Sequence, residues 1–315
     1  MPYGGASYLS NASSSTMQDQ LVQAHTQRLT GIALMCGAVT CFALLDATAK
    51  FLNLHMNTLE VVWARYTGAF VFPFMLSNPW TRPELLITHR LGLQMGRSLL
   101  LLASTLCNFA ALRYLQLDQV LALSFSTPFF VAALSGPILG EWVRWRRWTA
   151  ISVGFLGVLL VIRPGTGSIH PAAVLSLCAA LCYALYAITT RILARTDSNE
   201  TTFFYSNIVG ALALIPVLPF VWTTPHDPLI IGLMFAAGAL GAFGHYLLIA
   251  AHRLAPAAVL SPFIYTEIVL VTILGFVVFG DLPTRWTLAG ASIVIVSGLY
   301  MLHRERLRRR SSSRS

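Results

Sequence analysis

The feature that most constrains the fold of this chain is a series of apolar runs, each roughly 20 residues long, separated by short polar breaks. A run of that length crosses the roughly 30 Å hydrocarbon core of a bilayer as a single helix. Only 10% of the 315 residues are charged and 56% are hydrophobic, whereas a soluble domain carries about 25% charged residues. Because this is too little charge for a water-facing surface, we predict an all-α integral membrane protein.

The positions of the polar breaks predict ten transmembrane helices. Connections such as residues 53–57 and 253–256 are so short that consecutive helices must be antiparallel neighbours. The first 28 residues are rich in Ser, Gln and Asn, and we expect a disordered cytoplasmic N-terminal tail there; residues 303–315 form an Arg-rich cytoplasmic tail. The expected spans are residues 29–51, 58–77, 91–114, 118–140, 148–162, 172–193, 201–222, 229–251, 257–279 and 286–302.

The chain contains an internal repeat. The stretch Ala111 to Glu141 aligns with Ala251 to Asp281, which places the glycine–acid pair at the end of the first stretch on the same pair in the second. The alignment predicts two homologous halves, residues 29–163 and residues 171–302. Since each half contains five spans, an odd number, the second half begins on the opposite side of the membrane and the repeats are inverted. Inverted repeats are typical of alternating access, with the solute site near the midplane.

The net charge of +9 comes from basic residues in the breaks and in the C-terminal tail. With the N-terminus inside, the six tail arginines and most loop arginines face the cytoplasm, and four basic residues lie at outer ends: Lys50, Arg113, Arg163 and Arg285. We therefore expect both termini on the cytoplasmic side of the cytoplasmic (inner) membrane, with anionic lipid at the C-terminal tail. This distribution favours membrane orientation over nucleic-acid binding, and it leaves a homodimer open.

Several function classes are excluded by missing motifs. The G-x4-G-K-[ST] phosphate loop is absent because the single lysine, Lys50, follows Ala49, which argues against an ATP-driven pump. No H-E-x-x-H, G-x-S-x-G or G-x-G-D motif is present, so we do not expect an enzyme. We expect neither a metal nor a cofactor, because five cysteines lie in apolar runs without CxxC or histidines at metal spacing: Cys36, Cys41, Cys107, Cys178 and Cys182.

Charged residues inside the spans are candidates for the mechanism, because a charge in the hydrocarbon region needs a partner or a function. Asp46 and Lys50 share one face of the first span. Arg65 lies one turn or so into the second span, counted from the same side of the membrane. Asp46 and Arg65 either neutralise each other as a structural salt bridge or form a site for a substrate anion or a proton. Glu267 falls near the midplane of the ninth span and aligns with Thr127. Glu267 either carries a proton or meets a cationic solute, or it is satisfied by Arg65, a histidine or a tyrosine.

Polar and aromatic residues of other spans extend this set. His245 is either a proton relay or a hydrogen-bonding packing residue. Tyrosines offer an apolar face and a hydroxyl, so they either line a cavity for a flat solute or pack ordinarily. Pro128 and Pro262 interrupt the fourth and ninth spans, and we interpret them as gate hinges although they do not coincide in the alignment. The candidate cavity residues are Tyr183, Tyr186, Tyr205, Tyr246, Tyr265 and Asn108.

The order and spacing of several short motifs resemble the drug/metabolite transporter superfamily with two EamA domains, over nearly the whole chain. The matching motifs are Asp46-Ala-Thr-Ala-Lys50, Trp63-Ala-Arg65-Tyr66, Gly140-Glu141, Gly154-Phe-Leu-Gly157 with Arg163-Pro164-Gly165, and the run from Tyr265-Thr-Glu267 to Phe279-Gly-Asp-Leu-Pro283. In addition, Gly244-His245-Tyr246 with Tyr265-Thr-Glu267 is similar to the branch that includes bacterial uptake carriers for S-adenosylmethionine and riboflavin.

The resemblance implies ten helices in two inverted five-helix repeats around a central cavity. It also implies a secondary transporter or facilitator of a small organic metabolite, such as a vitamin, a nucleoside-like solute or an amino-acid-like solute. The alternatives are an exporter of amino acids or drugs with the same fold, a channel or non-transporting membrane protein, and an intramembrane enzyme. The expected partners are a small solute and the lipid bilayer.

Overall fold

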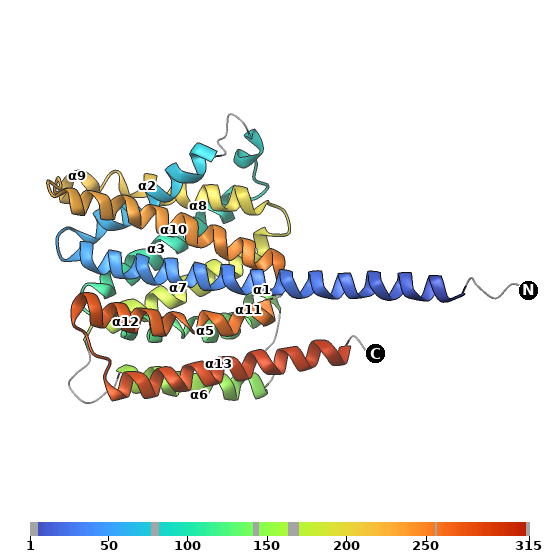
Figure 1. Cartoon of the computed structure of the whole chain (residues 1–315). Coiled ribbons are helices and arrows are strands. Elements are labelled where there is room, and N and C mark those ends of the chain that lie inside the picture. Colours follow the sequence, from blue (N-terminus) through green and yellow to red (C-terminus); the bar gives the residue numbers. More distant parts are fainter. Residues whose placement is uncertain (1–5, 77–81, 141–144, 163–169, 256, 313–315) are drawn as a thin grey trace, which may run out of the picture.

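The computed structural model describes residues 6–76, 82–140, 145–162, 170–255 and 257–312, and within these ranges every regular element is a helix (Figure 1). The all-α prediction is therefore confirmed for the described residues. The helices lie side by side in one bundle. They are α1 (Ala6–Asn53), α2 (Thr58–Leu76), η1 (Pro83–Leu86), α3 (Leu91–Leu112), α4 (Leu117–Ser124), α5 (Thr127–Leu139), α6 (Trp145–Ile162), α7 (Ala172–Leu193), α8 (Asn199–Leu214), α9 (Leu218–Val221), α10 (Pro228–Leu254), α11 (Ala257–Ile264), α12 (Glu267–Phe279) and α13 (Arg285–Ser312).

Six segments of the described chain are long and apolar enough to cross a membrane. They occur in both halves of the sequence, as expected for a multi-pass membrane protein. The prediction of ten spans is finer than this finding and stays a prediction. The six segments are Thr26–Asn53, Leu91–Leu112, Leu117–Leu139, Ala172–Leu193, Pro228–Leu254 and Pro262–Phe279.

The N-terminal segment differs from expectation. Residues 6–28, for which the polar composition predicts disorder, are helical and continuous with the first span in α1. From Ala6 this segment contains neither glycine nor proline, and a helix that is already nucleated extends easily into such a stretch. Both α1 and α13 project beyond the bundle at the same end, which we call the terminal end (Figure 1).

Two helices predicted as continuous are interrupted. The fourth span is divided into α4 and α5, of 8 and 13 residues, and the ninth into α11 and α12, again of 8 and 13 residues. Each pair ends on a left-handed glycine, Gly140 at φ 73° and Gly280 at φ 70°. Pro128 has no amide hydrogen for the carbonyl of residue 124, which accounts for the end of α4; Pro262 lies two residues before the end of α11. The two breaks coincide in the internal repeat although the prolines do not.

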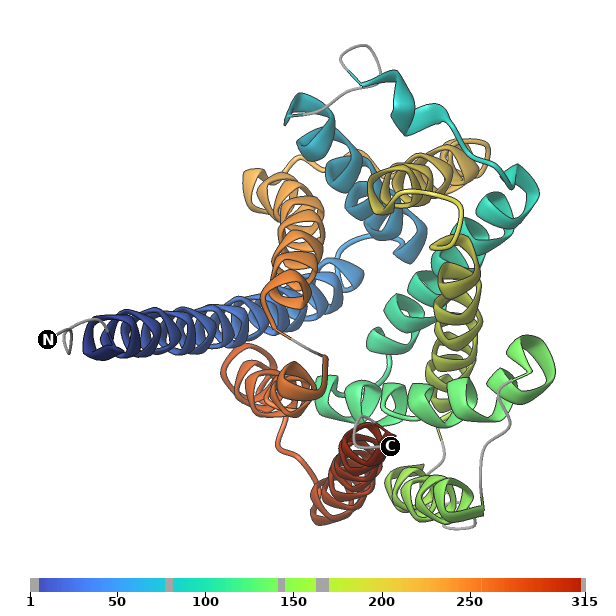
Figure 2. The ribbon, with the colours of Figure 1, turned by 90° about the vertical axis from the view of Figure 1, so that its right-hand side faces the viewer.

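The two halves interleave rather than forming separate bodies. Helix α1 packs on α10 and α12, whereas α7 packs on α3 and α5; likewise α2 packs on α10 and α8 packs on α3. These contacts map onto each other when α1 is exchanged with α7, α2 with α8, α3 with α10 and α5 with α12. Figure 2 looks along the helices and shows α6 and α13 as a pair at one edge. The core between the halves is apolar and includes Leu52, Val61, Tyr66, Leu112 and Leu117.

Helices α2 and α10 touch backbone to backbone at Gly68 and Gly238. A Cβ atom on Gly68 would lie 2.8 Å from the Cα of Gly238, and one on Gly238 would lie closer still to the Cα of Gly68. Small residues let membrane helices approach closely, so that van der Waals contact and not hydrophobicity holds them together. The crossing fixes the position of Arg65, which lies on α2 one turn from Gly68.

We expect Gly238→Ala to lower the free energy of unfolding by about 2 kcal/mol, because the added methyl forces α2 and α10 apart. Gly232→Ala is the matched control on the same helix, since no atom lies within 4 Å of a Cβ placed there. In the control, the better helix propensity of alanine should leave stability unchanged or raised. Unfolding in mixed micelles titrated with denaturing detergent measures both variants. Equal stability of the two variants would contradict the tight crossing.

At the terminal end, the segment before α3 is tied to the second half. Thr88 Oγ1 donates a hydrogen bond to Asp197, the backbone N–H of His89 donates to the same carboxyl over 3.2 Å, and Tyr205 Oη donates to the carbonyl of Leu86 over 3.0 Å. Partial burial raises the pKa of Asp197, but these hydrogen bonds outweigh it and hold the pKa below its usual value. The segment from Arg82 to His89 is thereby held against α8 and the connection that precedes it.

Candidate functional site

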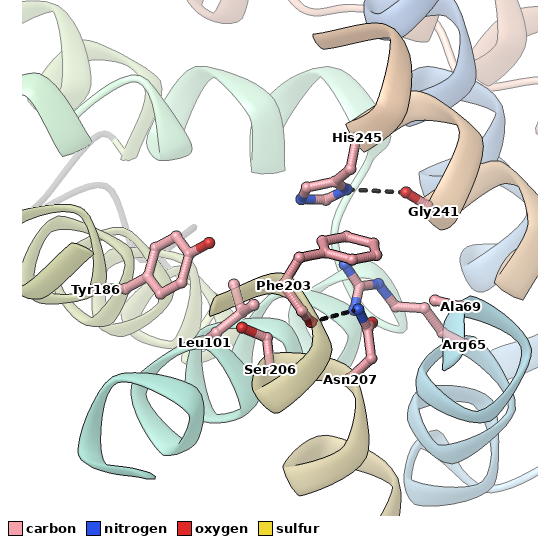
Figure 3. Close-up of a pocket in the computed structure, with 9 residues that line it drawn as sticks. All are labelled: Arg65, Ala69, Leu101, Tyr186, Phe203, Ser206, Asn207, Gly241 and His245. Atoms are coloured by element: carbon pink, nitrogen blue, oxygen red, sulfur yellow. Dashed lines mark hydrogen bonds between the residues drawn. The ribbon is translucent and has the colours of Figure 1, made fainter. Parts of the chain in front are cut away.

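A small pocket of about 10 Å³ lies in the interior, where helices of both halves meet (Figure 3). Three residues predicted from the sequence, Arg65, Tyr186 and His245, are among those that line it. They come from three helices, α2, α7 and α10. Helix α2 packs on α10 and α8, α8 packs on α3, and α3 packs on α7, so these contacts bring the three helices around one space. The lining residues are Arg65, Ala69, Leu101, Tyr186, Phe203, Ser206, Asn207, Gly241 and His245.

Arg65 supplies the positive charge of the pocket. Its side chain is 7% exposed, and its guanidinium lies over the ring of Tyr66, 4.6 Å from the ring centroid. Tyr66 is held in place by a hydrogen bond of 3.0 Å between its hydroxyl and that of Thr105. Among the described residues no carboxylate lies within 4.0 Å of Arg65, so the structural salt bridge with Asp46 is not formed here. Asp46 interacts with Arg65 electrostatically from a greater distance. A buried guanidinium without a carboxylate at ion-pair distance can accept an anion.

Two carboxyl groups approach each other from opposite halves of the chain. Asp46 of α1 is half-buried and accepts a hydrogen bond from Asn108 Nδ2 over 3.4 Å. Glu267 is 9% exposed, is the first residue of α12, and interacts electrostatically with Asp46. Within the described chain no hydrogen bond joins Glu267 to Arg65, His245 or a tyrosine.

His245 presents one ring nitrogen to the pocket. Its Nδ1 lies 2.8 Å from the carbonyl oxygen of Gly241, and because a carbonyl can only accept, Nδ1 must carry the hydrogen. Phe42 packs edge-on to the imidazole at a centroid distance of 5.1 Å. The ring projects from α10 toward the space between Tyr186 and Phe203 (Figure 3). In this tautomer Nε2 is an acceptor available to a solute or a water molecule.

The sequence interpretation missed Arg97, which it assigned to the cytoplasmic loops. Arg97 lies inside α3, is 3% exposed, and donates to Thr190 Oγ1 at 2.6 Å, Ser206 Oγ at 2.6 Å and Tyr186 Oη at 2.8 Å. It also donates to the carbonyl of Thr202 at 3.1 Å. These neutral acceptors tie α3 to α7 and α8 and fix the orientation of Tyr186. The signal was present, because Arg97 falls inside the predicted span 91–114.

Lys50 shares a helix face with Asp46, but its ion-pair partner is Asp281. Its Nζ lies 2.6 Å from Asp281 Oδ2 and 3.1 Å from the carbonyl oxygen of Leu115, with the ring of Phe279 at 4.8 Å. Asp281 follows α12, so this ion pair joins the two halves at the end of the bundle opposite the terminal end. It closes the bundle there.

The other predicted site residues lie outside the pocket. Tyr265 packs edge-on to Phe125, 5.2 Å between ring centroids, and its hydroxyl lies against Gly298 of α13. Asn108 reaches the site only through Asp46. Pro128 and Pro262 lie at the two helix breaks described above, and whether they act as hinges stays a prediction.

Comparison with known proteins identifies the family of the chain. The EamA-like transporter family matches residues 29–163 and 170–303. The S-adenosylmethionine uptake transporter of Rickettsia prowazekii is 27% identical over 280 residues, which cover 88% of this chain and 94% of the relative. The riboflavin transporter of Vibrio cholerae is 26% identical over 273 residues, covering 85% and 91%.

A crystal structure with 16% sequence identity superposes with a TM-score of 0.56, covering 90% of this chain and 98% of that one. At this identity the likeness concerns the fold alone. The family match, in contrast, takes in both halves of the chain and all the helices that line the pocket. The chain is therefore a member of the EamA-like transporter family, within the drug/metabolite transporter superfamily.

Proposed function

We propose that this protein is a secondary transporter that carries a small organic metabolite with an anionic group across the cytoplasmic membrane. The observation that carries the proposal is Arg65, a buried cation that lines an interior pocket and has no carboxylate within ion-pair distance in the described chain. A buried charge without a counter-charge costs free energy, which a bound anion would recover. A carboxylate or phosphate of a vitamin, nucleoside-like or amino-acid-like solute provides that anion.

The architecture supports alternating access. If α4 with α5 and α11 with α12 are each counted as one span, and α9 as the end of the α8 span, the helices make ten spans in two halves. The matched interruptions and the exchangeable packing contacts support inverted five-helix repeats. In such transporters the solute site lies near the midplane between the repeats, where broken helices meet.

The remaining groups of the site have complementary roles in this proposal. Asp46 and Glu267 carry a coupling proton or contact a cationic group of the solute. Tyr186, held by Arg97, offers a face for stacking against a flat ring, and its neighbour Tyr183 lies at a ring centroid distance of 5.3 Å. His245 accepts a hydrogen bond through Nε2. Both termini then face the cytoplasm, in keeping with the distribution of basic residues.

The experiment is uptake into proteoliposomes of labelled S-adenosylmethionine, riboflavin and amino acids, each with and without an imposed pH gradient. We expect saturable uptake of S-adenosylmethionine or an amino acid, both of which carry a carboxylate, and acceleration by the gradient if the carboxyl groups carry protons. Riboflavin, which has no anionic group, is the neutral comparison, and its saturable uptake would contradict an anion site at Arg65. Empty liposomes are the control. Saturable movement only out of preloaded vesicles would identify an exporter with the same fold. Flux without saturation would contradict the carrier proposal.

A further inference from the structure

A second cavity, of about 470 Å³, runs between α2 and α10 on the half of the bundle toward the terminal end. Its origin is the crossing at Gly68 and Gly238: two helices that touch backbone to backbone at one point and cross there must separate beyond it. The cavity is lined by Ala69, Phe70 and Phe74 of α2 and by six residues of α10 from Ala242 to Arg253, on the same side of the crossing, and residues of α8 line it as well.

The walls of this groove are apolar and mainly aromatic, and they open outward. Phe243 is 46% exposed and Tyr246 is 66% exposed, so the groove faces the lipid around the bundle and not only the interior. A groove of this kind matches the cross-section and chemistry of an acyl chain. The apolar wall residues include Phe70, Phe74, Phe204, Phe243, Tyr246 and Ile249.

Charged residues stand only at one end of the groove. Arg82, Arg253 and Glu200 line it there, where α2 and α10 end and lipid headgroups begin. Arg253 lies 3.5 Å from Glu200, and both side chains are more than half exposed. No carboxylate of the described chain lies within 4.0 Å of Arg82, and the ties of Thr88 and Tyr205 hold the segment that begins with Arg82 against α8. The mouth therefore has a net charge of +1 and suits an anionic headgroup.

We propose that this groove binds one anionic phospholipid, with an acyl chain along the aromatic walls and the phosphate between Arg82 and Arg253. Its site is separate from the C-terminal basic tail. Ala69, Phe203 and Asn207 line both the groove and the pocket that contains Arg65. The acyl chain thus lies against the wall of the candidate transport site. The binding itself does not depend on the proposed transport function.

The test uses the purified full-length protein in detergent, with phosphatidylglycerol and phosphatidylcholine of identical acyl chains as probes. Lipid retention is measured by native mass spectrometry, and stability by thermal unfolding. We expect phosphatidylglycerol to be retained preferentially and to raise the unfolding temperature more than phosphatidylcholine does. Inorganic phosphate alone should give no shift, since it lacks the chain that fills the groove. Equal retention of the two lipids, or an equal shift with phosphate, would overturn the proposal.

Matched variants locate the site. Arg82→Ala should weaken phosphatidylglycerol retention about fivefold, because one basic residue near the surface contributes about that factor. Arg113→Ala is the control, because Arg113 is exposed and follows the C-terminal end of α3, away from the terminal end. This variant should leave phosphatidylglycerol retention unchanged. Glu200→Gln should strengthen retention by freeing Arg253. If the ion pair were merely structural, that variant would lower stability without affecting lipid, and the proposal would fail.

The groove itself is tested without any change of charge. Ala250→Phe fills it and should reduce retention of phosphatidylglycerol severalfold, while Val269→Phe places the same bulk on an exposed site of α12 and should leave retention at the wild-type level. Undiminished retention in Ala250→Phe would show that the lipid binds elsewhere.

Discussion

Replacing Arg65 with glutamine is expected to reduce saturable uptake about 100-fold while leaving the folded protein at least as stable as the wild type. Removing one charged partner of a buried pair costs about 2–5 kcal/mol, and here the lost partner is the one that would meet the solute's anion. Without solute, Arg65 is a buried cation that lies over Tyr66 and has no ion-pair partner in the described chain. Its removal therefore breaks no ion pair and takes a buried charge out of the empty protein, at the expense of a more distant interaction with Asp46.

The matched variant is Arg97→Gln, which removes the same charge from a neighbouring helix. Arg97 donates hydrogen bonds to Thr190, Ser206 and Tyr186, so its loss leaves buried acceptors unpaired and should lower the free energy of unfolding by several kcal/mol. Arg65→Lys should retain part of the uptake, since the charge remains but the planar fork is lost. Uptake by Arg65→Gln at the wild-type rate would remove Arg65 from the site. A large loss of stability in that variant would instead assign it a structural role.

Sequence reasoning singled out Arg65, which lines the pocket, but it missed Arg97 and did not identify the partners of the charged residues. The cost of charge in the hydrocarbon region singled out Asp46, Arg65 and Glu267 from their position in apolar runs alone. Partner choice depends on how helices from the two halves pack, which no local pattern contains. Lys50 illustrates this: Asp46 is four residues away on the same helix, yet the ion pair forms with Asp281, 231 residues along the chain.

The internal repeat contains more of the fold than the positions of the prolines indicate. The alignment of the stretches around Pro128 and Pro262 placed Thr127 on Glu267, and these are the first residues of α5 and α12. Pro128 and Pro262 do not align with each other, so the prolines alone do not indicate that the fourth and ninth spans break at equivalent positions of the repeat. Tyr265 was a candidate for lining the cavity because a tyrosine has an apolar face and a hydroxyl, but residues in a helix break point in directions that a regular helical periodicity does not describe. Its hydroxyl lies against Gly298 instead.

The ion pair between Lys50 and Asp281 carries the second large prediction, because it fastens the two halves together with little access to water. The side chains are 11% and 27% exposed. Asp118 lies close enough to interact electrostatically with both, is 5% exposed, and has one carboxyl oxygen without a hydrogen-bond partner in the described chain. The cluster thus holds two carboxyl groups and one ammonium group, and the two ways of breaking the pair are not equivalent.

Lys50→Met leaves both carboxyl groups without a cation and should lower the free energy of unfolding by about 3 kcal/mol, as expected for breaking a buried pair. Asp281→Asn leaves Lys50 with Asp118 as a partner and should cost about half as much. The double variant Lys50→Met/Asp281→Leu should recover much of the loss, since an apolar pair of similar volume often replaces a buried ion pair without penalty. With the single variant Asp281→Leu measured as well, a double-mutant cycle from unfolding in mixed micelles gives the coupling energy.

The exposed pair of Arg253 and Glu200 provides the comparison, because Glu200→Gln should change stability by less than about 1 kcal/mol. In an alternating-access cycle the ion pair between Lys50 and Asp281 must break each time the bundle opens at the end opposite the terminal end. The strength of this ion pair therefore sets the fraction of time for which that end is closed. The single variants should then favour the state that is open at that end and alter the apparent affinity for solute presented there. Equal effects of Lys50→Met and Asp281→Asn would exclude Asp118 from the cluster. A coupling energy near zero would mean that the ion pair does not hold the halves together.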